Sequence, residues 1–290
     1  MKPIDLMRHL AIPLSALFVC GCVTLTVDPR AVVSGTGAAG GFMTLKCDTA
    51  AHVLPGVISD DPENALDGRA FRVLVWNIHK EDDGGWQRDL TAFAAANDVM
   101  LLQETVLQPS LREIIDDAGL RWVMASSFLY DANDIGVLTA TRIAPLASCT
   151  QRTLEPLLRI PKSAVITWLR IKGRQETLAI VNVHAINFDL FIDRYRMQFE
   201  ALVDALSGHK GPIVFAGDFN SWNDARDRVV AEVAVRLRMT ELELHDDHRA
   251  VFFGRHLDHF FVRGLELIDV EAIPVTSSDH NPLVATLRIR

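Results

Sequence analysis

The sequence predicts an α/β (α+β) fold in which two β-sheets pack face to face and helices cover their outer faces. Two observations lead to this fold class. Short apolar segments typical of buried strands are interspersed with segments of helical period between residues 69 and 290. Several of these strands also follow one another in pairs without an intervening helix, which does not fit a doubly wound parallel sheet.

The expected strands share a short apolar, often β-branched run bounded by turn or polar residues. In chain order they cover residues 71–76, 99–102, 122–126, 135–141, 164–171, 178–184, 213–216, 260–262, 266–272 and 283–289. The expected helices share apolar residues at helical spacing, and they cover residues 86–97, 109–118, 191–206 and 225–237. Pro109 supports the start of the second helix, because proline suits the first helical turn.

The strand at 213–216 is followed directly by Gly217, Asp218 and, two residues later, Asn220. Residues i and i+2 that leave a strand point to the same side, so a carboxylate and a carboxamide project together. In open α/β sheets, ligands usually bind at this carboxyl end of the strands. Taken alone, the stretch favours an ordinary Asx-rich turn.

Polar residues stand at the edges of other apolar runs in the same way. They are Asn77, Glu104, His184, Asp258, Asp279 and His280. Each one singly is accounted for equally well by a cap, a surface acid, a buried histidine or a turn. All of them together are hard to produce by chance, so the sequence predicts that they share one site.

Four blocks of residues resemble the signature motifs of the endonuclease/exonuclease/phosphatase superfamily. They are Trp76-Asn77, Gln103-Glu104, Gly217-Asp218-Phe219-Asn220 and Ser278-Asp279-His280-Asn281-Pro282. The resemblance covers roughly residues 69–290 and is greatest to the uncharacterised bacterial YafD-type branch. It implies a four-layer sandwich of two packed mixed β-sheets flanked by helices.

The resemblance also implies a divalent cation, Mg²⁺ or Mn²⁺. Asn77 and Glu104 are the expected ligands, with Asp279 as a third. Hard cations of this kind prefer oxygen donors and keep several waters.

The remaining motif residues have catalytic roles by the same resemblance. Asp218 is expected to align or deprotonate the attacking water, and Asn220 to hold that water and the phosphate. His184 and His280 are expected to donate hydrogen bonds to phosphate oxygens, with general-base catalysis by His280 as the alternative. Asp258 is expected to orient His280.

Arg159 and Lys162 flank Pro161 just before an expected strand. They are candidates to bind the substrate phosphate. A solvated pair of cations on a loop accounts for them equally well.

The charge balance limits the class of substrate partner. The chain has 29 basic and 37 acidic residues and a formal net charge of −8. This balance does not favour a strong non-specific nucleic-acid binder, but it suits a site built from carboxylates.

We therefore expect a metal-dependent phosphoesterase, a phosphodiesterase or nuclease that hydrolyses P–O bonds by in-line attack of water and works as a monomer. The alternatives are a phospholipid-headgroup phosphodiesterase or phosphatase, and a non-catalytic envelope protein that keeps the scaffold for binding.

The first 22 residues are expected to direct export. Lys2 and Arg8 precede an apolar run over residues 10–20, which has the length of a signal-peptide core. The run ends in a sequence that resembles a bacterial lipobox, with Cys22 as the lipidated residue. The resemblance implies a lipid-anchored protein of the cell envelope, in the periplasm or at the outer membrane. A plain secretory signal and an uncleaved membrane anchor are the alternatives.

Residues 23–68 are expected to form a flexible tether, because they are rich in Gly, Ala, Thr, Asp and Pro and have no sustained period. The glycine-rich stretch 35–41 lies within this segment. Residues 69–290 form the expected folded domain. Cys47 and Cys149 either pair in a disulfide or remain separate thiols, and we expect separate thiols because one lies in the tether.

Overall fold

A computed structural model describes residues 25–27, 32–34, 43–48, 62–189 and 191–290 of the chain. The expected signal segment with Cys22 and the glycine-rich stretch 35–41 lie outside these described residues. Within the described part, no helix has the length and apolar character needed to cross a bilayer.

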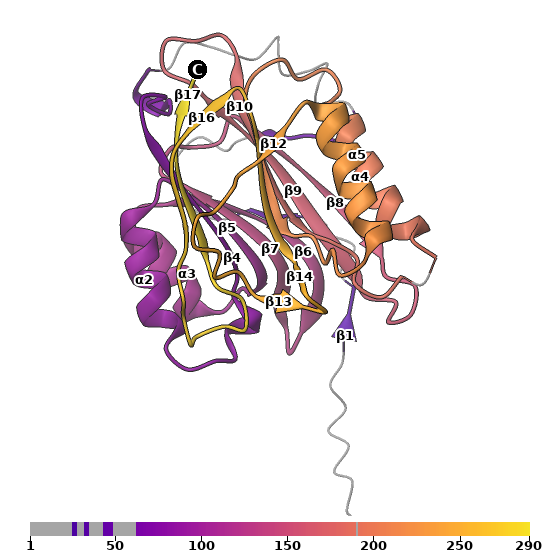
Figure 1. Cartoon of the computed structure of the whole chain (residues 1–290). Coiled ribbons are helices and arrows are strands. Elements are labelled where there is room, and N and C mark those ends of the chain that lie inside the picture. The colour runs from indigo at the N-terminus through magenta and orange to yellow at the C-terminus, as the bar shows by residue number, and fades with distance from the viewer. Residues whose placement is uncertain (1–24, 28–31, 35–42, 49–61, 190) are drawn as a thin grey trace, which may run out of the picture.

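Two mixed β-sheets pack face to face, with helices on the outer face of each (Figure 1). The first sheet follows the order β1 (Leu25–Thr26), β6 (Arg121–Tyr130), β7 (Asn133–Thr141), β5 (Val99–Val106), β4 (Phe71–Asn77), β17 (Leu283–Ile289) and β16 (Leu265–Ala272), and β2 (Val32–Ser34) also pairs with β6. The second follows the order β12 (Thr240–Glu241), β15 (Asp258–Arg263), β11 (Ile213–Asp218), β10 (Thr177–His184), β9 (Pro161–Arg170), β8 (Ala147–Leu154) and β3 (Met43–Thr44). The expected four-layer sandwich is confirmed.

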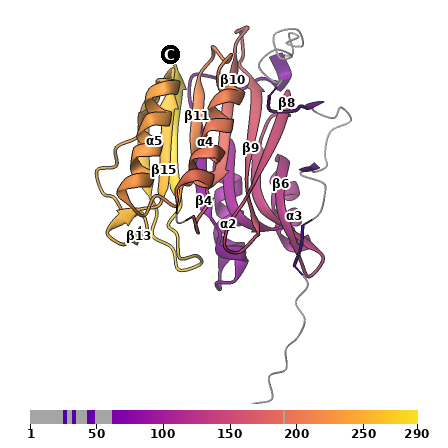
Figure 2. The same cartoon turned by 90° about the vertical axis from the view of Figure 1, so that its right-hand side faces the viewer.

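The helices form the two outer layers, as the turned view in Figure 2 shows for α4 and α5. They are α2 (Trp86–Ala96) and α3 (Pro109–Asp117) on the first sheet, and α4 (Asp193–Leu206) and α5 (Asp224–Leu237) on the second. Short elements complete the fold: the β13 (Val251–Phe252) and β14 (Arg255–His256) hairpin, and the 3₁₀ turns η2 (Pro62–Asn64) and η3 (His79–Glu81).

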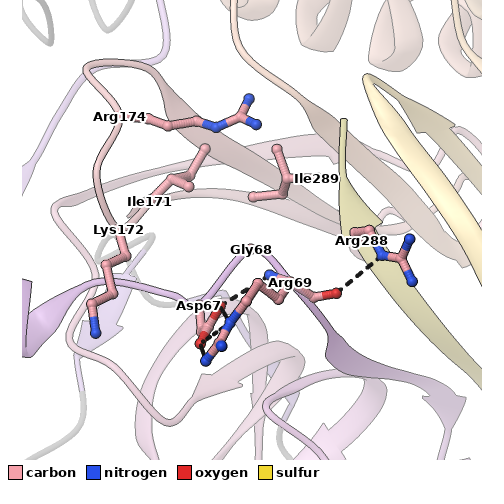
Figure 3. A pocket seen from close by; sticks show the side chains of 8 residues that line it. All are labelled: Asp67, Gly68, Arg69, Ile171, Lys172, Arg174, Arg288 and Ile289. Carbon is pink, nitrogen blue, oxygen red and sulfur yellow. Dashed lines mark hydrogen bonds and ion pairs between the residues drawn. The ribbon is translucent and has the colours of Figure 1, made fainter.

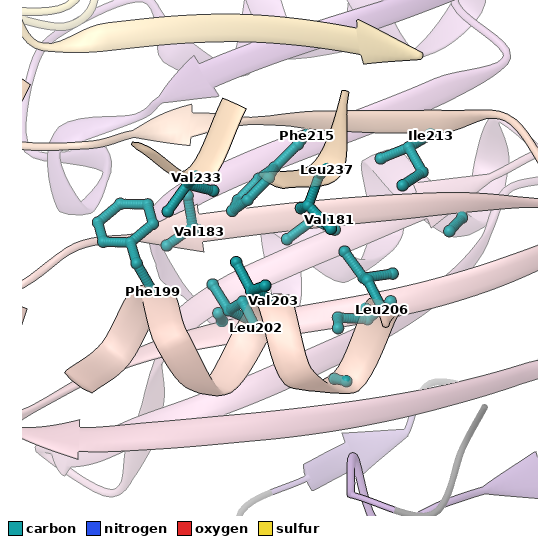
Figure 4. Packing of buried hydrophobic residues seen from close by; sticks show 14 of the residues in the cluster. Val181, Val183, Phe199, Leu202, Val203, Leu206, Ile213, Phe215, Val233 and Leu237 are labelled. Carbon is teal, nitrogen blue, oxygen red and sulfur yellow. The ribbon is translucent and has the colours of Figure 1, made fainter. Parts of the chain in front are cut away.

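Strand β10 shows why the central segments read as continuous apolar runs. All of its residues are buried, because one face meets helices and the other meets the first sheet. Val181 packs with Leu202 of α4 and Val233 of α5 in the cluster drawn in Figure 4. Ile180, which points the other way, belongs to the core between the two sheets.

Every strand and helix expected from the sequence is present, and the main difference is at β8. Its sequence Ala-Ser-Cys-Thr-Gln-Arg-Thr-Leu lacks an apolar run, because the second half of the strand is only partly buried. A strand with polar residues on both faces gives no clear periodic signal.

The expectation of a flexible tether does not hold for three short segments within residues 23–68. Leu25 of β1 pairs with Tyr130, Val32 of β2 pairs with Ala125, and Met43 of β3 pairs with Ala147. These segments satisfy the exposed backbone groups of β6 and β8, which would otherwise be open sheet edges.

Cys47 and Cys149 form a disulfide, so the expectation of two separate thiols was wrong. Their Cα atoms are 5.2 Å apart although 102 residues separate them in the chain. The pairing of β3 with β8 brings the two together, and sequence separation hides that proximity.

We expect the Cys47→Ser variant to be less stable than the wild type by roughly 2–5 kcal/mol, since the disulfide closes a long loop. Urea unfolding of the oxidised proteins measures this difference. Reductant should lower the unfolding midpoint of the wild type and leave that of the variant unchanged. Equal midpoints for the two oxidised proteins would contradict the expectation.

His209 gives the fold a predictable dependence on pH. Burial, together with the nearby charge of Arg263, lowers the pKa of His209 to about 4, although its ring hydrogen bond to Pro212 O opposes the shift. Between pH 6.5 and 4 the unfolded chain therefore binds more protons at this residue than the folded chain.

The free energy of unfolding should fall as pH falls from about 6.5 to about 4, because protonating His209 favours the unfolded state. Denaturant unfolding at several pH values across this window measures the slope. His209→Gln should give a shallower slope, and an unchanged slope would rule out this residue as a contributor.

Candidate active site

The predicted polar residues meet at one edge of the sandwich, where several strands end. In the second sheet, His184 of β10 is the register partner of Asp218 of β11, and Asp218 is the partner of Asp258 of β15. In the first sheet, Asn77 of β4 is the partner of Gln103 of β5. Strand pairing therefore aligns these residues in two rows that face each other.

Buried amide groups join the two sheets directly behind this edge. The Nε2 atom of Gln103 donates to Asn182 Oδ1 over 2.7 Å. Asn182 Nδ2 donates in turn to the backbone carbonyls of Leu102 and Leu138, over 3.2 and 3.0 Å. Both side chains are fully buried, so this network holds the first sheet against β10.

Gly217 lets β11 lie close to β10 immediately before Asp218. Its φ angle is 143°, and a Cβ atom there would lie 2.0 Å from the Val183 carbonyl oxygen. Asn220 then adopts a left-handed conformation with φ of 47°, which asparagine tolerates. The Gly-Asp-Phe-Asn block is thus a tight exit from the strand, as its sequence indicates.

Glu104 reaches the site through a β-bulge. The register of β5 with β7 shifts between Leu102 and Thr105, and Glu104 has a φ of 52°. Leu102 packs on the helix side of its sheet, so regular alternation would place Glu104 on that side as well. The extra residue instead turns the carboxylate toward the second sheet.

The Glu104 carboxylate lies among two lysine ammonium groups and the His184 ring. It pairs with the ammonium group of Lys80, and its Oε1 atom lies 3.9 Å from Lys162 Nζ and 3.6 Å from His184 Nε2. Burial opposes the charge of Glu104, yet the surrounding positive groups lower its pKa to about 2. Glu104 is therefore ionised at neutral pH.

Lys80 is a site residue that the sequence pattern did not single out. It lies in η3, where His79, Lys80 and Glu81 all have positive φ angles of 49°, 56° and 63°. Glu81 ties this turn to β5, because its buried carboxylate accepts the Val106 backbone N–H over 3.0 Å. Strained backbone of this kind gathers at functional sites, but it leaves no signal in residue type.

His184 is a neutral imidazole in this setting. Its burial, reinforced by the Lys162 charge, lowers its pKa to about 4. The Lys162 ammonium lies 2.8 Å from His184 Nε2, and because an ammonium only donates, this ring nitrogen accepts. Lys162, one of the two candidate substrate-binding cations, is thus the charged donor beside His184.

Asp218 is held by contacts from both sheets. Its Oδ2 atom accepts from Asn77 Nδ2 over 3.0 Å, and the same oxygen lies 3.5 Å from His184 Nε2. Its Oδ1 atom accepts the backbone N–H of Asn220 over 2.9 Å. The side chain of Asn220 donates to Ala185 O over 3.0 Å, so it ties the loops after β10 and β11 together.

His280 has the opposite charge state to His184. Burial opposes its protonation, but Asp258, whose Oδ2 atom lies 2.7 Å from His280 Nδ1, raises the pKa of His280 to about 10. The second carboxylate oxygen of Asp258 is buried without a hydrogen-bond partner. A protonated ring donates, so this state favours the hydrogen-bond donor role over general-base catalysis by His280.

The loop that carries His280 is fastened to the end of β4. Trp76 Nε1 donates to the His280 carbonyl over 3.1 Å, and Ser278 Oγ donates to the Asn77 carbonyl over 2.7 Å. These contacts fix His280 relative to Asn77 across more than 200 residues of chain.

Arg226 holds the loops after β10 and β11 together, and the sequence did not predict this role. It is fully buried, and its guanidinium lies 4.5 Å from the ring centroids of both Tyr195 and Trp222. It donates to the carbonyls of Ile186 and Asn220, which belong to the loops after β10 and β11. Residue type and helical spacing give no hint of this role.

A cavity of about 240 Å³ opens beside these groups. Glu104, Lys80, Lys162 and His184 line one part of it. Phe128, Leu158, Ile160 and Phe188 are among the residues that line the rest. The charged part of the cavity suits a phosphate, and the apolar part suits an apolar group of the same ligand.

A larger cavity of about 510 Å³ is lined by none of the predicted catalytic residues (Figure 3). It is lined by Asp67, Arg69, Lys172 and Arg174, among others, and Asp67 is paired with Arg69 over 2.6 Å. The 240 Å³ cavity is therefore the one that belongs to the predicted site.

Two predicted residues are exposed, unlike the rest of the set. Asp279 has a side chain that is 60% exposed, and its ion pair is with His79 Nδ1 at 3.8 Å. Arg159 is exposed on the loop between β8 and β9 and does not line the active-site cavity. Their roles as metal ligand and phosphate ligand stay predictions.

Among the described residues, no group of three or more His, Cys, Asp or Glu side chains is arranged to hold a metal ion. The donor chemistry of Glu104 and Asn77 nonetheless fits a hard cation. Glu104 is a half-buried, ionised carboxylate that pairs with positive charge, and Asn77 presents a carboxamide on the adjacent parallel strand.

Known proteins resemble this chain in sequence and in fold. The sequence profile of the endonuclease/exonuclease/phosphatase family matches residues 74–280. A UPF0294 protein of Vibrio parahaemolyticus is 38% identical over 226 residues, which cover 77% of this chain and 79% of that protein. A UPF0294 protein of Yersinia pestis is 37% identical over 214 residues, which cover 74% of this chain and 82% of that protein.

Solved structures share the fold at low identity. The human Nocturnin catalytic domain with bound sulfate matches with a TM-score of 0.59 and 18% identity, over 78% of this chain and 97% of that one. D. rerio TDP2 complexed with a single-strand DNA product matches with a TM-score of 0.57 and 16% identity, over 76% of this chain and 99% of that one.

We expect Asp258→Asn to lower the pKa of His280 from about 10 toward its ordinary value, because the carboxylate charge that stabilises the imidazolium is lost. NMR titration of the His280 ring measures this shift. The control is Glu241→Gln, which removes a carboxylate that contacts His259 and should leave His280 unchanged. An unaltered His280 titration in Asp258→Asn would refute the pairing.

Proposed function

Because the chain belongs to the endonuclease/exonuclease/phosphatase family, we propose that it is a metal-dependent phosphoesterase that breaks P–O bonds by in-line attack of water. The family and the shared fold support phosphoesterase chemistry. The observation that carries the proposal is the convergence of Glu104, Asp218 and the Asp258–His280 pair at one edge of the sandwich.

Asp218 is the group we assign to the attacking water. It is buried, and its two oxygens are held by Asn77 and Asn220, so it points in one direction without support from solvent. A fixed carboxylate aligns a water and accepts its proton as the bond to phosphorus forms. No covalent intermediate with the protein is needed.

His280 and Lys162 are the groups we assign to the phosphate oxygens. Both carry N–H donors, and His280 stays charged because Asp258 faces it. Donors placed before the reaction stabilise the charge that develops in the transition state. His184, being neutral, positions Lys162 and adds no charge of its own.

Glu104 and Asn77 would hold the divalent cation, Mg²⁺ or Mn²⁺. Such an ion polarises a phosphoryl oxygen and neutralises charge on the leaving group. Lys80 and Lys162 are close to the Glu104 carboxylate. They would either share this carboxylate with the cation or move away from it when the cation binds.

A phosphodiester is the substrate class we propose. The D. rerio TDP2 structure holds a single-strand DNA product, which makes DNA the first polymer to assay here. The formal net charge of −8 supports weak rather than tight binding of a polyanion. We further propose that the protein is a monomer anchored in the cell envelope through a lipid on Cys22.

We expect Glu104→Gln and Asp218→Asn each to lower kcat/KM by roughly 10²–10⁴-fold, because the first removes the carboxylate that would hold the cation and the second removes the base for the attacking water. Bis-(p-nitrophenyl) phosphate and a short DNA duplex, each with Mg²⁺, are the substrates. Chelation of the metal should abolish hydrolysis, and Mg²⁺ or Mn²⁺ should restore it.

Matched controls are Glu176→Gln and Asp246→Asn, which make the same chemical change at exposed positions. They should retain the wild-type rate. Hydrolysis by Glu104→Gln and Asp218→Asn at the rate of these controls would sink the proposal, provided that thermal unfolding shows all four to be folded.

A further inference from the structure

Six large apolar side chains are exposed on two loops and the β13–β14 hairpin near the active-site cavity. They are Leu157, Leu158, Phe188, Phe191, Phe252 and Phe253, with exposed fractions of 59, 54, 47, 78, 50 and 77%. We call this set the apolar rim. Exposed apolar residues are unremarkable when scattered singly, but a group of six beside one opening marks an interaction surface.

The three loops of the apolar rim are linked to one another. The Phe188 backbone N–H donates to the Glu155 carboxylate over 2.8 Å, which joins the loop after β10 to the loop before β9. Trp222 Nε1 donates to Asn187 Oδ1 over 3.0 Å, and its ring lies 6.4 Å from that of Phe253. These contacts connect the three segments that carry the rim.

The rim borders the catalytic groups themselves. Leu158 and Phe188 line the same 240 Å³ cavity as Glu104 and His184. Whatever covers the rim therefore also lies over the entrance to the site.

The loops present their apolar side chains from ordered backbone. Glu155 is buried and accepts backbone N–H groups of both Asn187 and Phe188. Phe253 stands at a hairpin turn with a φ of 50°, a conformation that is uncommon for an aromatic residue. The ordered backbone keeps these aromatic rings exposed to water. Burying them against a partner is favourable, so we expect a partner to cover them.

The first described strand lies at the same end of the molecule as the rim. Leu25 and Thr26 of β1 pair with Tyr130 and Leu129 at the far end of β6, and β1 and the β13–β14 hairpin lie at one end in Figure 1. Cys22 precedes Leu25 by three residues, a span of at most about 11 Å. A lipid on Cys22, or the apolar run at residues 10–20, would therefore enter a membrane beside the rim.

We propose that the apolar rim docks on the surface of a phospholipid bilayer, so that the active site takes phosphate esters presented at that surface. Phenylalanine and leucine on separate projecting loops suit the headgroup boundary, where apolar groups can insert by a few ångströms. Lys80 and Lys162 lie behind them, where a headgroup phosphate would arrive. The docking proposal does not depend on hydrolysis. The proposal that the bilayer presents the substrate rests on the proposed function.

Depth-dependent quenching of tryptophan fluorescence tests the docking. The full chain, as the Phe253→Trp or Val235→Trp variant, is reconstituted into phosphatidylethanolamine/phosphatidylglycerol vesicles with or without brominated acyl chains. Phe253 and Val235 are each 77% exposed, but Val235 lies on α5, away from the rim. The emission of the added tryptophan is obtained by subtracting the wild-type signal.

We expect brominated lipid to reduce the added emission at least twofold in Phe253→Trp and to leave it unchanged in Val235→Trp. Phe191→Trp, at a position that is 78% exposed on a different loop, should behave as Phe253→Trp does and serves if that variant does not fold. Equal quenching at the rim and at α5, or none at the rim, overturns the proposal.

Two further measurements separate membrane docking from catalysis and from self-association. Adding Glu104→Gln to Phe253→Trp should leave the quenching unchanged, so a failure of docking and a failure of hydrolysis are told apart. A change in Phe253→Trp emission that follows the protein-to-lipid ratio, and that bromine does not affect, assigns the rim to a second copy of the chain and overturns membrane docking.

Discussion

The hydrogen bond between the Asn182 and Gln103 side chains is the contact on which the active-site arrangement depends. Glu104 and Asn77 come from one sheet, whereas His184 and Asp218 come from the other, so the site exists only if the sheets keep a fixed offset. Apolar packing is non-directional and would tolerate small slides between sheets. Buried amides do not, since an unpaired one costs about 1–3 kcal/mol.

The position of Asn182 also accounts for the direction of His184. Residues two apart on a strand point to the same side, so an asparagine that reaches the first sheet places His184 toward that sheet as well. The same rule applies in β4, where Val75 lies in the core between the sheets and Asn77 follows it. The core that stabilises the fold thus continues directly into the row of catalytic side chains.

Two histidines of the same site are held in opposite charge states by their neighbours. Burial and a lysine keep His184 neutral, whereas a buried carboxylate keeps His280 protonated. Charge is therefore distributed over the site before any substrate arrives. This arrangement suits a reaction in which negative charge gathers on a phosphorus centre, because little reorganisation is needed as that charge develops.

The sequence by itself determined the two-sheet sandwich, its main strands and helices, and the set of polar residues at the strand ends. Buried strands leave apolar runs, and Gly217 with Asp218 and Asn220 leaves a recognisable exit from one of them. Only the tertiary structure decided how those residues are used. The bulge that turns Glu104, the left-handed turn that brings Lys80 to it, and the Cys47–Cys149 disulfide all depend on contacts between distant segments. Alternation along a strand predicts which face of the sheet a side chain lies on only while the strand is regular. Residue type does not show where pairing with another strand introduces a bulge.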